Sequence, residues 1–367
     1  MTATLVLRNV KRIDGSSSDI VLANSRIVDI VPPNTGNGEK VIDFKNNVYV
    51  SSGWIDMHVH AFPDFDPYGD EIDEIGYKLG VTTIVDAGST GADQIHSLVN
   101  YSKMAKTNVF AMLNISQIGL KQINELSNLT WLNEEELVKA VAEYKDFIVG
   151  LKARISNSVV GQNGVEPLKI ARDFSKNTNL PLMVHIGSGP PDIEEVLALM
   201  EEKDILTHYL NGKSNNLFGD VGEPLPTFLQ AIERGVHLDV GHGNASFSFR
   251  TAEQAKKHLI KFDTISTDIY RKNRLHGPVF SMADLLTKFL YLGYSLQEII
   301  DAVTINAARW LEKPELGRIA TGDIANLTLF SVEDQSVVLR DSEGEEREHD
   351  KKIVVKGVVI NGEYIEC

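Results

Sequence analysis

The chain has 367 residues, of which 43% are hydrophobic and 24% charged, and its formal net charge is −15. This length exceeds one average domain and suits a single α/β barrel with a small additional domain. The acidic balance disfavours nucleic acid and anionic membrane surfaces as partners. The single cysteine, Cys367, excludes disulfide frameworks and cysteine-based zinc sites.

The sequence contains no segment that suggests export or membrane insertion. Residues 1–11 have no apolar core followed by a small-residue cleavage site, and no apolar run approaches the roughly 20 residues that cross a bilayer. We therefore expect a soluble, cytoplasmic protein with no membrane partner.

Both ends of the chain predict β-structure. Short strands separated by Asn, Asp and Gly fill the first 50 residues or so, and the same pattern returns from about Gly317. The acidic segment 341–348 predicts a solvated hairpin tip within the second region. Because neither end is long, we expect one composite β-sandwich domain built from residues 1–51 and 312–367.

The middle of the chain predicts alternating strands and helices. Apolar, β-branched runs occur at residues 55–58, 82–86, 109–114, 148–154, 182–185, 205–209, 237–240 and 265–269. Amphipathic helices are expected between several of them, for example over 133–144, where Asn133 before three glutamates predicts an N-cap, and two more are expected over 282–292 and 296–311. Eight such units predict an α/β fold with a (β/α)₈ TIM barrel over residues 52–311.

Side chains that bind metals follow several of the predicted strands. Active sites of such barrels lie at the C-terminal ends of the strands. The residues found at these ends are His58 and His60 on the first strand, Lys152 on the fourth, His185 on the fifth, His208 on the sixth and Asp268 on the eighth. His58 and His60 are two residues apart, so both point to one side of their strand. These residues together predict a metal centre at the barrel mouth.

Lys152 and Asp268 each admit two interpretations. An ordinary lysine would form a salt bridge, and an ammonium among metal ions would repel them. A lysine deprotonated by burial can instead react with carbon dioxide, giving a carbamate whose oxygens could bridge two divalent cations. His58, His60 and Asp268 would then bind one ion, and His185 and His208 the other. Asp268 could also serve as general base and acid, or merely cap a helix.

The chain resembles the amidohydrolase superfamily of metal-dependent hydrolases. The resemblance covers essentially the whole chain and rests on SGWIDMHVH at 52–60, GVTT at 80–83, VTINAA at 303–308 and GRIATGDIANL at 317–327. It implies a binuclear site, usually of zinc, with Lys152 carbamylated, and it allows for a homo-oligomer. Within the superfamily the chain is similar to a branch often labelled dihydroorotase or adenine deaminase, whose characterised relatives deacetylate small acylated hydroxy or amino acids.

Two departures from family patterns favour the deacetylase function. Dihydroorotases carry an arginine two residues after the second histidine, where this chain has Phe62, and many deaminases carry a glutamate where it has Ser188. We therefore expect a metal-bridging hydroxide to attack the acyl carbonyl of a small acylated acid, ester or amide, with Asp268 as general base and acid. A dihydroorotase-like cyclic amidase and an adenine-type deaminase remain alternatives. A non-catalytic scaffold is disfavoured because all six ligands are present.

A carboxylate-bearing small-molecule substrate requires positive or polar contacts at the barrel mouth. Arg154 lies two residues past Lys152, so strand alternation directs it to the same side, although a salt bridge at the rim would explain it equally well. His242 lies between two glycines after the seventh strand and is either a substrate contact or a structural turn residue. Arg271 follows Asp268 in the next loop and is a third candidate contact.

Overall fold

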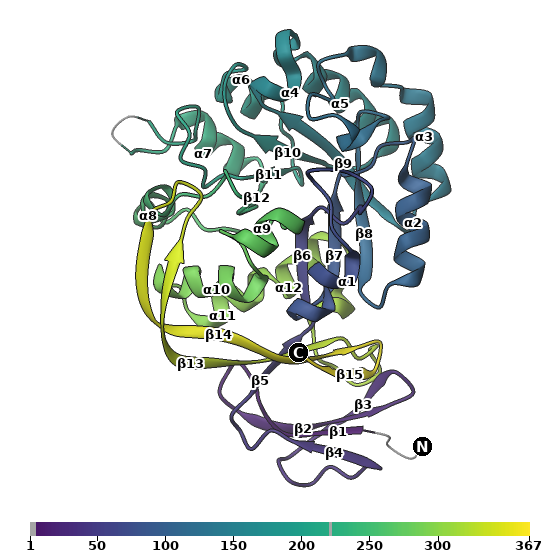
Figure 1. Cartoon of the computed structure of the whole chain (residues 1–367), viewed down its shortest axis with the longest axis vertical. Helices are drawn as coiled ribbons and strands as arrows, with labels where there is room; N and C mark the ends of the chain where they lie inside the picture. The colour runs from purple at the N-terminus through teal and green to yellow at the C-terminus, as the bar shows by residue number, and fades with distance from the viewer. Residues whose placement is uncertain (1–4, 220–221) are drawn as a thin grey trace.

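The computed structural model describes residues 5–219 and 222–367, so residues 1–4, at the start of the expected N-terminal β region, lie outside it. Figure 1 shows a curved sheet surrounded by helices and, below it, a second sheet near both chain ends. None of the helices in the described part of the chain is both long and apolar enough to cross a membrane.

The curved sheet is parallel, and its strands follow one another in chain order. Among the described residues its strands are β6 (Trp54–Val59), β7 (Val81–Ala87), β8 (Asn108–Asn114), β9 (Ile148–Ile155), β10 (Leu182–Ile186), β11 (Ile205–Thr207) and β12 (His237–Asp239). Their carboxyl ends therefore lie at one edge of the sheet, where the sequence places the expected metal ligands.

The segment 264–269 connects the two outer strands of this sheet. Thr264 forms an isolated parallel bridge with Asp239 of β12, and Ile269 forms one with Val59 of β6. The expected strand over 265–269 is therefore wrong as a regular strand, because Asp268 takes a left-handed backbone conformation with φ 51°. The segment nevertheless contacts both edges of the curved sheet.

Helices lie around the curved sheet (Figure 1). They are α1 (Ile72–Ile75), α2 (Ile95–Met104), α3 (Glu134–Glu143), α4 (Asn157–Val160), α5 (Glu166–Thr178), α6 (Ile193–Ala198), α7 (Pro226–Glu233), α8 (Phe249–Lys257), α9 (Arg271–His276), α10 (Met282–Tyr291), α11 (Leu296–Ala302) and α12 (Ile305–Trp310). Asn133 caps α3 as expected, since its side chain accepts a hydrogen bond from the Glu136 amide.

The helix expected over 296–311 is wrong as a single element, because it is divided into α11 and α12. The break falls at Val303 and Thr304, where the Val303 carbonyl accepts a hydrogen bond from the amide of Ile55 at 2.7 Å. The Thr304 hydroxyl meanwhile donates to the Ile300 carbonyl. The interruption thus attaches the helical region to the start of β6.

The second sheet joins the two ends of the chain. Its order is β15-β14-β13-β5-β1-β2-β3, with β4 paired to β1. The strands are β1 (Leu5–Lys11), β2 (Ser17–Ala23), β3 (Arg26–Val31), β4 (Lys40–Asp43), β5 (Tyr49–Ser52), β13 (Leu327–Arg340), β14 (Glu346–Ile360) and β15 (Glu363–Glu366). Leu7, Val50 and Leu329 contribute to its separate apolar core. Strands from both ends of the chain therefore belong to one sheet.

The hairpin of β13 and β14 extends from this sheet along α10 to α8 (Figure 1). The expectation of a solvated tip is wrong for Asp341, which is only 1% exposed. Its carboxylate accepts hydrogen bonds from the amides of Phe249, Glu343 and Glu345. The first residue of the tip is therefore fixed against the segment that follows β12, whereas residues 343–346 and 348 are exposed as expected.

Candidate metal centre and active site

His58, His60 and Asp268 form a group that could hold a metal ion, because their ligand atoms all lie within 4.8 Å of one another. The Nε2 atoms of His58 and His60 lie 3.5 Å and 3.2 Å from Oδ1 of Asp268. Alternation along β6 directs both histidines to the same side, while the bridge between Val59 and Ile269 brings Asp268 beside them. Three expected ligands are thus adjacent.

His185 and His208 lie next to this group. The ring centroids of His185 and His208 are 4.4 Å apart, and those of His58 and His208 are 5.0 Å apart. His208 follows β11 with φ 70°, a left-handed conformation that is uncommon for residues other than glycine and that it shares with Asp268. Backbone strain therefore occurs at two of the expected ligands.

His208 has one buried ring nitrogen without a partner. Its Nδ1 lies 2.5 Å from the Gly241 carbonyl, which can only accept, so Nδ1 carries the hydrogen. The other nitrogen, Nε2, has no hydrogen-bond partner among the described residues. Burial, opposed by Asp268, lowers the pKa of His208 to about 3. The ring therefore presents an unprotonated lone pair, as a metal ligand must.

A hydrogen-bond chain fixes the ring of His58 in the same way. The Thr207 hydroxyl donates to Asp239 at 2.8 Å, so it accepts from His58 Nδ1 at 2.9 Å, leaving Nε2 free to ligate. Burial, reinforced by the charge of Lys152, holds the pKa of His58 well below its usual range. Burial likewise lowers the pKa of His185. Neutral imidazoles are the form that binds metal ions.

Lys152 is fully buried beside His58. Its Nζ lies 3.1 Å from Nε2 of His58 and 3.1 Å from the Met183 sulfur. Burial lowers the pKa of Lys152 to about 7, despite the opposing charges of Asp268 and Asp239. No carboxylate among the described residues forms a salt bridge with it. The alternative of an ordinary salt-bridged lysine therefore has no support in the structure.

Two glycines let the backbone approach the expected ligands closely. A Cβ at Gly88 would lie 2.6 Å from Cβ of Lys152, and one at Gly243 would lie 2.3 Å from Oδ2 of Asp268. Both glycines have positive φ, 76° and 53° respectively. The Gly-rich turn around His242 thus makes room for Asp268, one of the expected ligands.

Asp268 is an ionised carboxylate that does not cap a helix. The next helix, α9, begins at Arg271 and its N-cap is Tyr270. Burial by itself would raise the pKa of Asp268, but the hydrogen bond with His60 and the charges of His208 and Lys152 lower it overall. The side chain is 15% exposed, so a small molecule at the mouth can reach it.

The three expected substrate contacts lie in different surroundings. Arg154 lies at the mouth, with NH1 3.5 Å from Glu125 and its guanidinium 5.5 Å from the Tyr68 ring centroid. Both ring nitrogens of His242 face protein atoms, the carbonyl of Gly243 and Nζ of Lys288.

Arg271, the third expected contact, is oriented toward an acidic side chain of the loop after β6. Its Nε lies 3.6 Å from the buried carboxylate of Asp70, and its side chain is 44% exposed.

Several supporting carboxylates escaped the sequence reasoning. Glu125 is fully buried beside Arg154, and burial raises the pKa of Glu125 to about 7. The carboxylate of Asp86 accepts hydrogen bonds from the amides of Ala61 and Ser89. The carboxylate of Asp239 accepts the hydrogen bond from Thr207, whose hydroxyl in turn contacts His58. Asp86 and Asp239 could have been found, because both lie near the ends of apolar strands, as the expected ligands do. Glu125 lies in a loop that carries no such signal.

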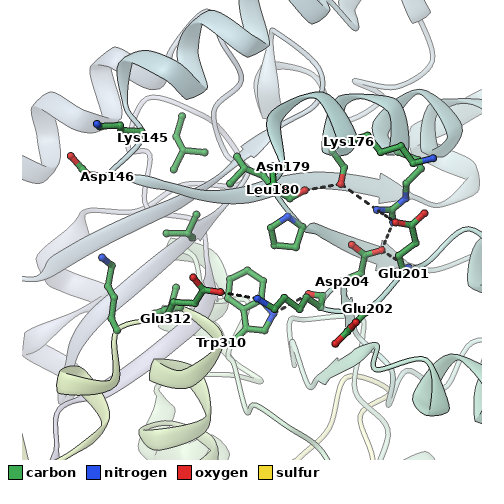
Figure 2. A pocket seen from close by; sticks show the side chains of 18 residues that line it. Lys145, Asp146, Lys176, Asn179, Leu180, Glu201, Glu202, Asp204, Trp310 and Glu312 are labelled. Atoms are coloured by element: carbon green, nitrogen blue, oxygen red, sulfur yellow. Dashed lines mark hydrogen bonds and ion pairs between the residues drawn. The ribbon is translucent and has the colours of Figure 1, made fainter.

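A pocket of about 610 Å³ lies at the opposite ends of the strands (Figure 2). Leu180 and Asp204, which line it, precede β10 and β11, and none of the expected ligands is among its lining residues. Some of its charged groups pair with one another, as Lys203 does with Glu312 at 2.7 Å. This hollow is therefore separate from the expected metal ligands.

Comparison with known proteins places the chain in a family. The model of the amidohydrolase family matches residues 49–365. The chain belongs to this family. It is 40% identical to a deacetylase of Enterococcus faecalis, over 99% of each chain.

Two crystal structures resemble the chain over essentially its whole length. One is described as an adenine deaminase, with 39% identity, a TM-score of 0.96 and full coverage of both chains. The other is described as a dihydroorotase, with 30% identity, a TM-score of 0.92 and coverage of 100% of this chain and 99% of the other. The chain is thus an amidohydrolase-family hydrolase, and its group of His58, His60 and Asp268 fits the metal centre that such enzymes use.

Proposed function

We propose that this hydrolase deacetylates a small acylated hydroxy acid or amino acid at a binuclear metal centre. The site would lie at the mouth of a (β/α)₈ barrel formed by residues 52–311, flanked by a β-sandwich domain of residues 1–51 and 312–367. The observation that carries the proposal is the buried Lys152 beside His58, with an unprotonated His208 across from it.

His58, His60 and Asp268 would bind one ion, and His185 and His208 the other. Lys152 would bridge the two as a carbamate. A pKa near 7 supports this role, because a neutral amine can react with carbon dioxide whereas an ammonium cannot. Imidazole and carboxylate ligands suit zinc, and divalent ions bound there supply Lewis-acid polarisation of the acyl carbonyl and activation of water.

Asp268 would transfer the proton. Its lowered pKa keeps the carboxylate ionised near neutral pH, so Oδ1 or Oδ2 can accept a proton from the attacking water. The same oxygen would then protonate the alcohol or amine that leaves. Gly243, next to Oδ2, keeps the space around the carboxylate open.

Arg154 would bind the carboxylate of the substrate. Of the three expected contacts, Arg154 is the one that lies opposite an expected metal ligand, His185, on the neighbouring strand. A charge-assisted pair between guanidinium and carboxylate would orient the acyl group. His242 and Arg271 already engage Lys288 and Asp70, and we assign them supporting roles in the surrounding loops. The partner is thus a small carboxylate-bearing molecule.

Cyclic amidase or adenine deaminase activity is the second candidate, favoured by the similarity to the crystal structures of an adenine deaminase and a dihydroorotase. Phe62 weighs against the dihydroorotase-like reaction. It is buried and packs on Phe65 and Tyr101, so it offers no cation at the position where dihydroorotases carry arginine.

An acyl-group screen tests the proposal. Protein loaded with zinc and bicarbonate would be incubated with both enantiomers of N-acetyl amino acids and of acetylated 2-hydroxy acids, with acetate release as the readout. Adenine and dihydroorotate would be assayed in parallel. We expect acetate from one of the two acid series, whereas ammonia from adenine or turnover of dihydroorotate, without acetate release, would establish the second candidate.

A further inference from the structure

Lys213 lies in the loop after β11 and brings a second cation to the barrel mouth. A Cβ at Gly187, two residues past His185, would lie 3.3 Å from Nζ of Lys213. The side chain is half-buried. Its ammonium therefore reaches from the loop after β11 to the end of β10. On the neighbouring strand β9, Arg154 lies opposite His185 of β10.

The charge of Lys213 acts on the proposed metal centre. Burial lowers the pKa of Lys213. The charge of Asp268 partly offsets this effect, and the charge of Arg154 lowers the pKa of Lys213 further. The charges of Arg154 and Lys213 both act on His185 as well. Two cations thus lie near the end of β10, because Arg154 of β9 is opposite His185 and Lys213 reaches Gly187.

The backbone of Lys213 is held firmly, whereas its ammonium is not. The Lys213 amide donates to the side chain of Asn211, which itself donates to the His208 carbonyl at 2.9 Å. Asn216 holds the Lys213 carbonyl at 2.5 Å. No described side chain forms a hydrogen bond or an ion pair with Nζ. The loop therefore places a charge at the mouth without neutralising it.

The hairpin tip supports this loop from outside. A Cβ at Gly212 would lie 2.3 Å from Oε1 of Glu343, so the hairpin side chain packs against the residue that precedes Lys213. Glu343 is in turn fixed by the Ser248 hydroxyl at 2.8 Å. The position of Lys213 is consequently set by two segments far apart in the sequence.

An unneutralised cation at this place calls for an anionic ligand. Arg154 and Lys213 repel each other and would repel divalent ions at the neighbouring histidines, and a carboxylate between them would relieve both repulsions. The chain carries a net charge of −15, so it attracts anions only where cations are concentrated locally.

We propose that Lys213 binds the substrate carboxylate together with Arg154 and is a specificity-determining residue of the reaction. This inference rests on the deacetylase function proposed above. Lys213 selects acids over their neutral amides, while Asp268 and the metal ligands act on the acyl group whichever analogue is bound.

Matched substrates and variants test the role of Lys213. KM and kcat would be compared for N-acetylalanine and its carboxamide in wild type, Lys213→Met and Lys213→Arg. Loss of one charge-assisted hydrogen bond corresponds to about a 10- to 100-fold rise in KM for the acid, with little change in kcat or for the carboxamide. Lys213→Arg should retain most of the preference. Lys145→Met, in the pocket at the opposite end of the strands (Figure 2), is the charge-matched control and should behave as wild type.

A binding measurement separates this inference from the proposed function. Calorimetry would compare the 2-hydroxy acid lactate with lactamide as probes on the metal-loaded protein, after thermal melting has shown that Lys213→Met is folded. Weaker lactate binding in Lys213→Met supports the inference even if wild type releases no acetate, a result that would overturn the deacetylase function alone. Unchanged lactate binding and unchanged acid preference in Lys213→Met would overturn the role of Lys213.

Discussion

Nζ of Lys152 lies 3.1 Å from Nε2 of His58, and both side chains are buried near the carboxyl ends of the strands of the curved sheet. An ammonium there would have a desolvated charge and no carboxylate partner, which is energetically costly. A carbamate on the same nitrogen would provide two oxygens to the surrounding imidazole sites. This pair of residues is therefore where the proposed metal centre can be tested most readily.

Replacing Lys152 should remove the proposed bridge between the two metal sites. We expect Lys152→Ala to lose bound metal and at least 100-fold of the acetate-releasing activity, with partial rescue by short carboxylic acids that occupy the vacated space. Lys152→Met is the matched control, because its side chain fills that space and should prevent rescue. Metal analysis and acetate assays measure both, and full activity in Lys152→Ala would exclude the bridging role.

The same lysine should make the stability of the metal-free protein depend on pH. Burial lowers the pKa of Lys152 from 10.5 to about 7 in the folded state. Between these values only the unfolded chain keeps the proton, so the free energy of unfolding should rise with pH across this range. Each pKa unit of difference between the folded and unfolded states corresponds to about 1.4 kcal/mol, so the free energy of unfolding should rise by a few kcal/mol.

Urea unfolding of metal-free wild type and Lys152→Met at pH 7 and pH 9 isolates this effect. Other titrating groups contribute equally to both proteins, so Lys152→Met should show a smaller rise in stability, and Lys145→Met should match wild type. An identical rise in Lys152→Met and wild type would show that Lys152 is not protonated differently in the folded state.

Gly243 provides a test of the close approach to Asp268. A Cβ there would lie 2.3 Å from Oδ2, so Gly243→Ala should displace the carboxylate and lower metal affinity and kcat/KM, the latter by about 100-fold. Gly164→Ala is the control, because Gly164 has a similar φ of 55° but nothing within 4 Å of the added atom. Equal losses in the two variants would point to backbone strain rather than to contact with Asp268.

Thr207 and Asp239 should tune metal binding through His58. Thr207→Val removes the acceptor of the His58 Nδ1 hydrogen, and we expect metal affinity to fall about 10- to 100-fold. Thr264→Val removes a hydroxyl that donates to the same Asp239 at 2.7 Å but contacts no expected ligand. Competition with a chelator measures the affinities. Comparable losses in both variants would attribute the effect to general destabilisation of Asp239.

The placement of His58 and His60 on one side of β6 could be predicted because it depends on simple periodicity, whereas Asp268 lies in an irregular segment. Side chains two residues apart on a strand share a side, and parallel strands place their carboxyl ends together. The same reasoning located Lys152 on β9 and His185 on β10, in adjacent strands of the curved sheet. It required no knowledge of loops or of distant packing.

Features that depend on long-range packing could not be predicted in this way. Lys213 lies in an irregular loop fixed by Asn211 and by a hairpin more than a hundred residues away. The buried Asp341 was mistaken for part of a solvated tip, because acidic composition does not reveal that backbone amides of another segment will bind it. The helix break at Thr304 likewise follows from a hydrogen bond between Val303 and the distant Ile55.

Native mass spectrometry of the intact protein, prepared with zinc and bicarbonate, tests the central claim most directly. The account predicts a chain carrying two metal ions and the added mass of one carbon dioxide, with that mass lost in Lys152→Met. A wild-type chain that retains the unmodified mass and binds at most one ion under these conditions would contradict a binuclear centre bridged by Lys152.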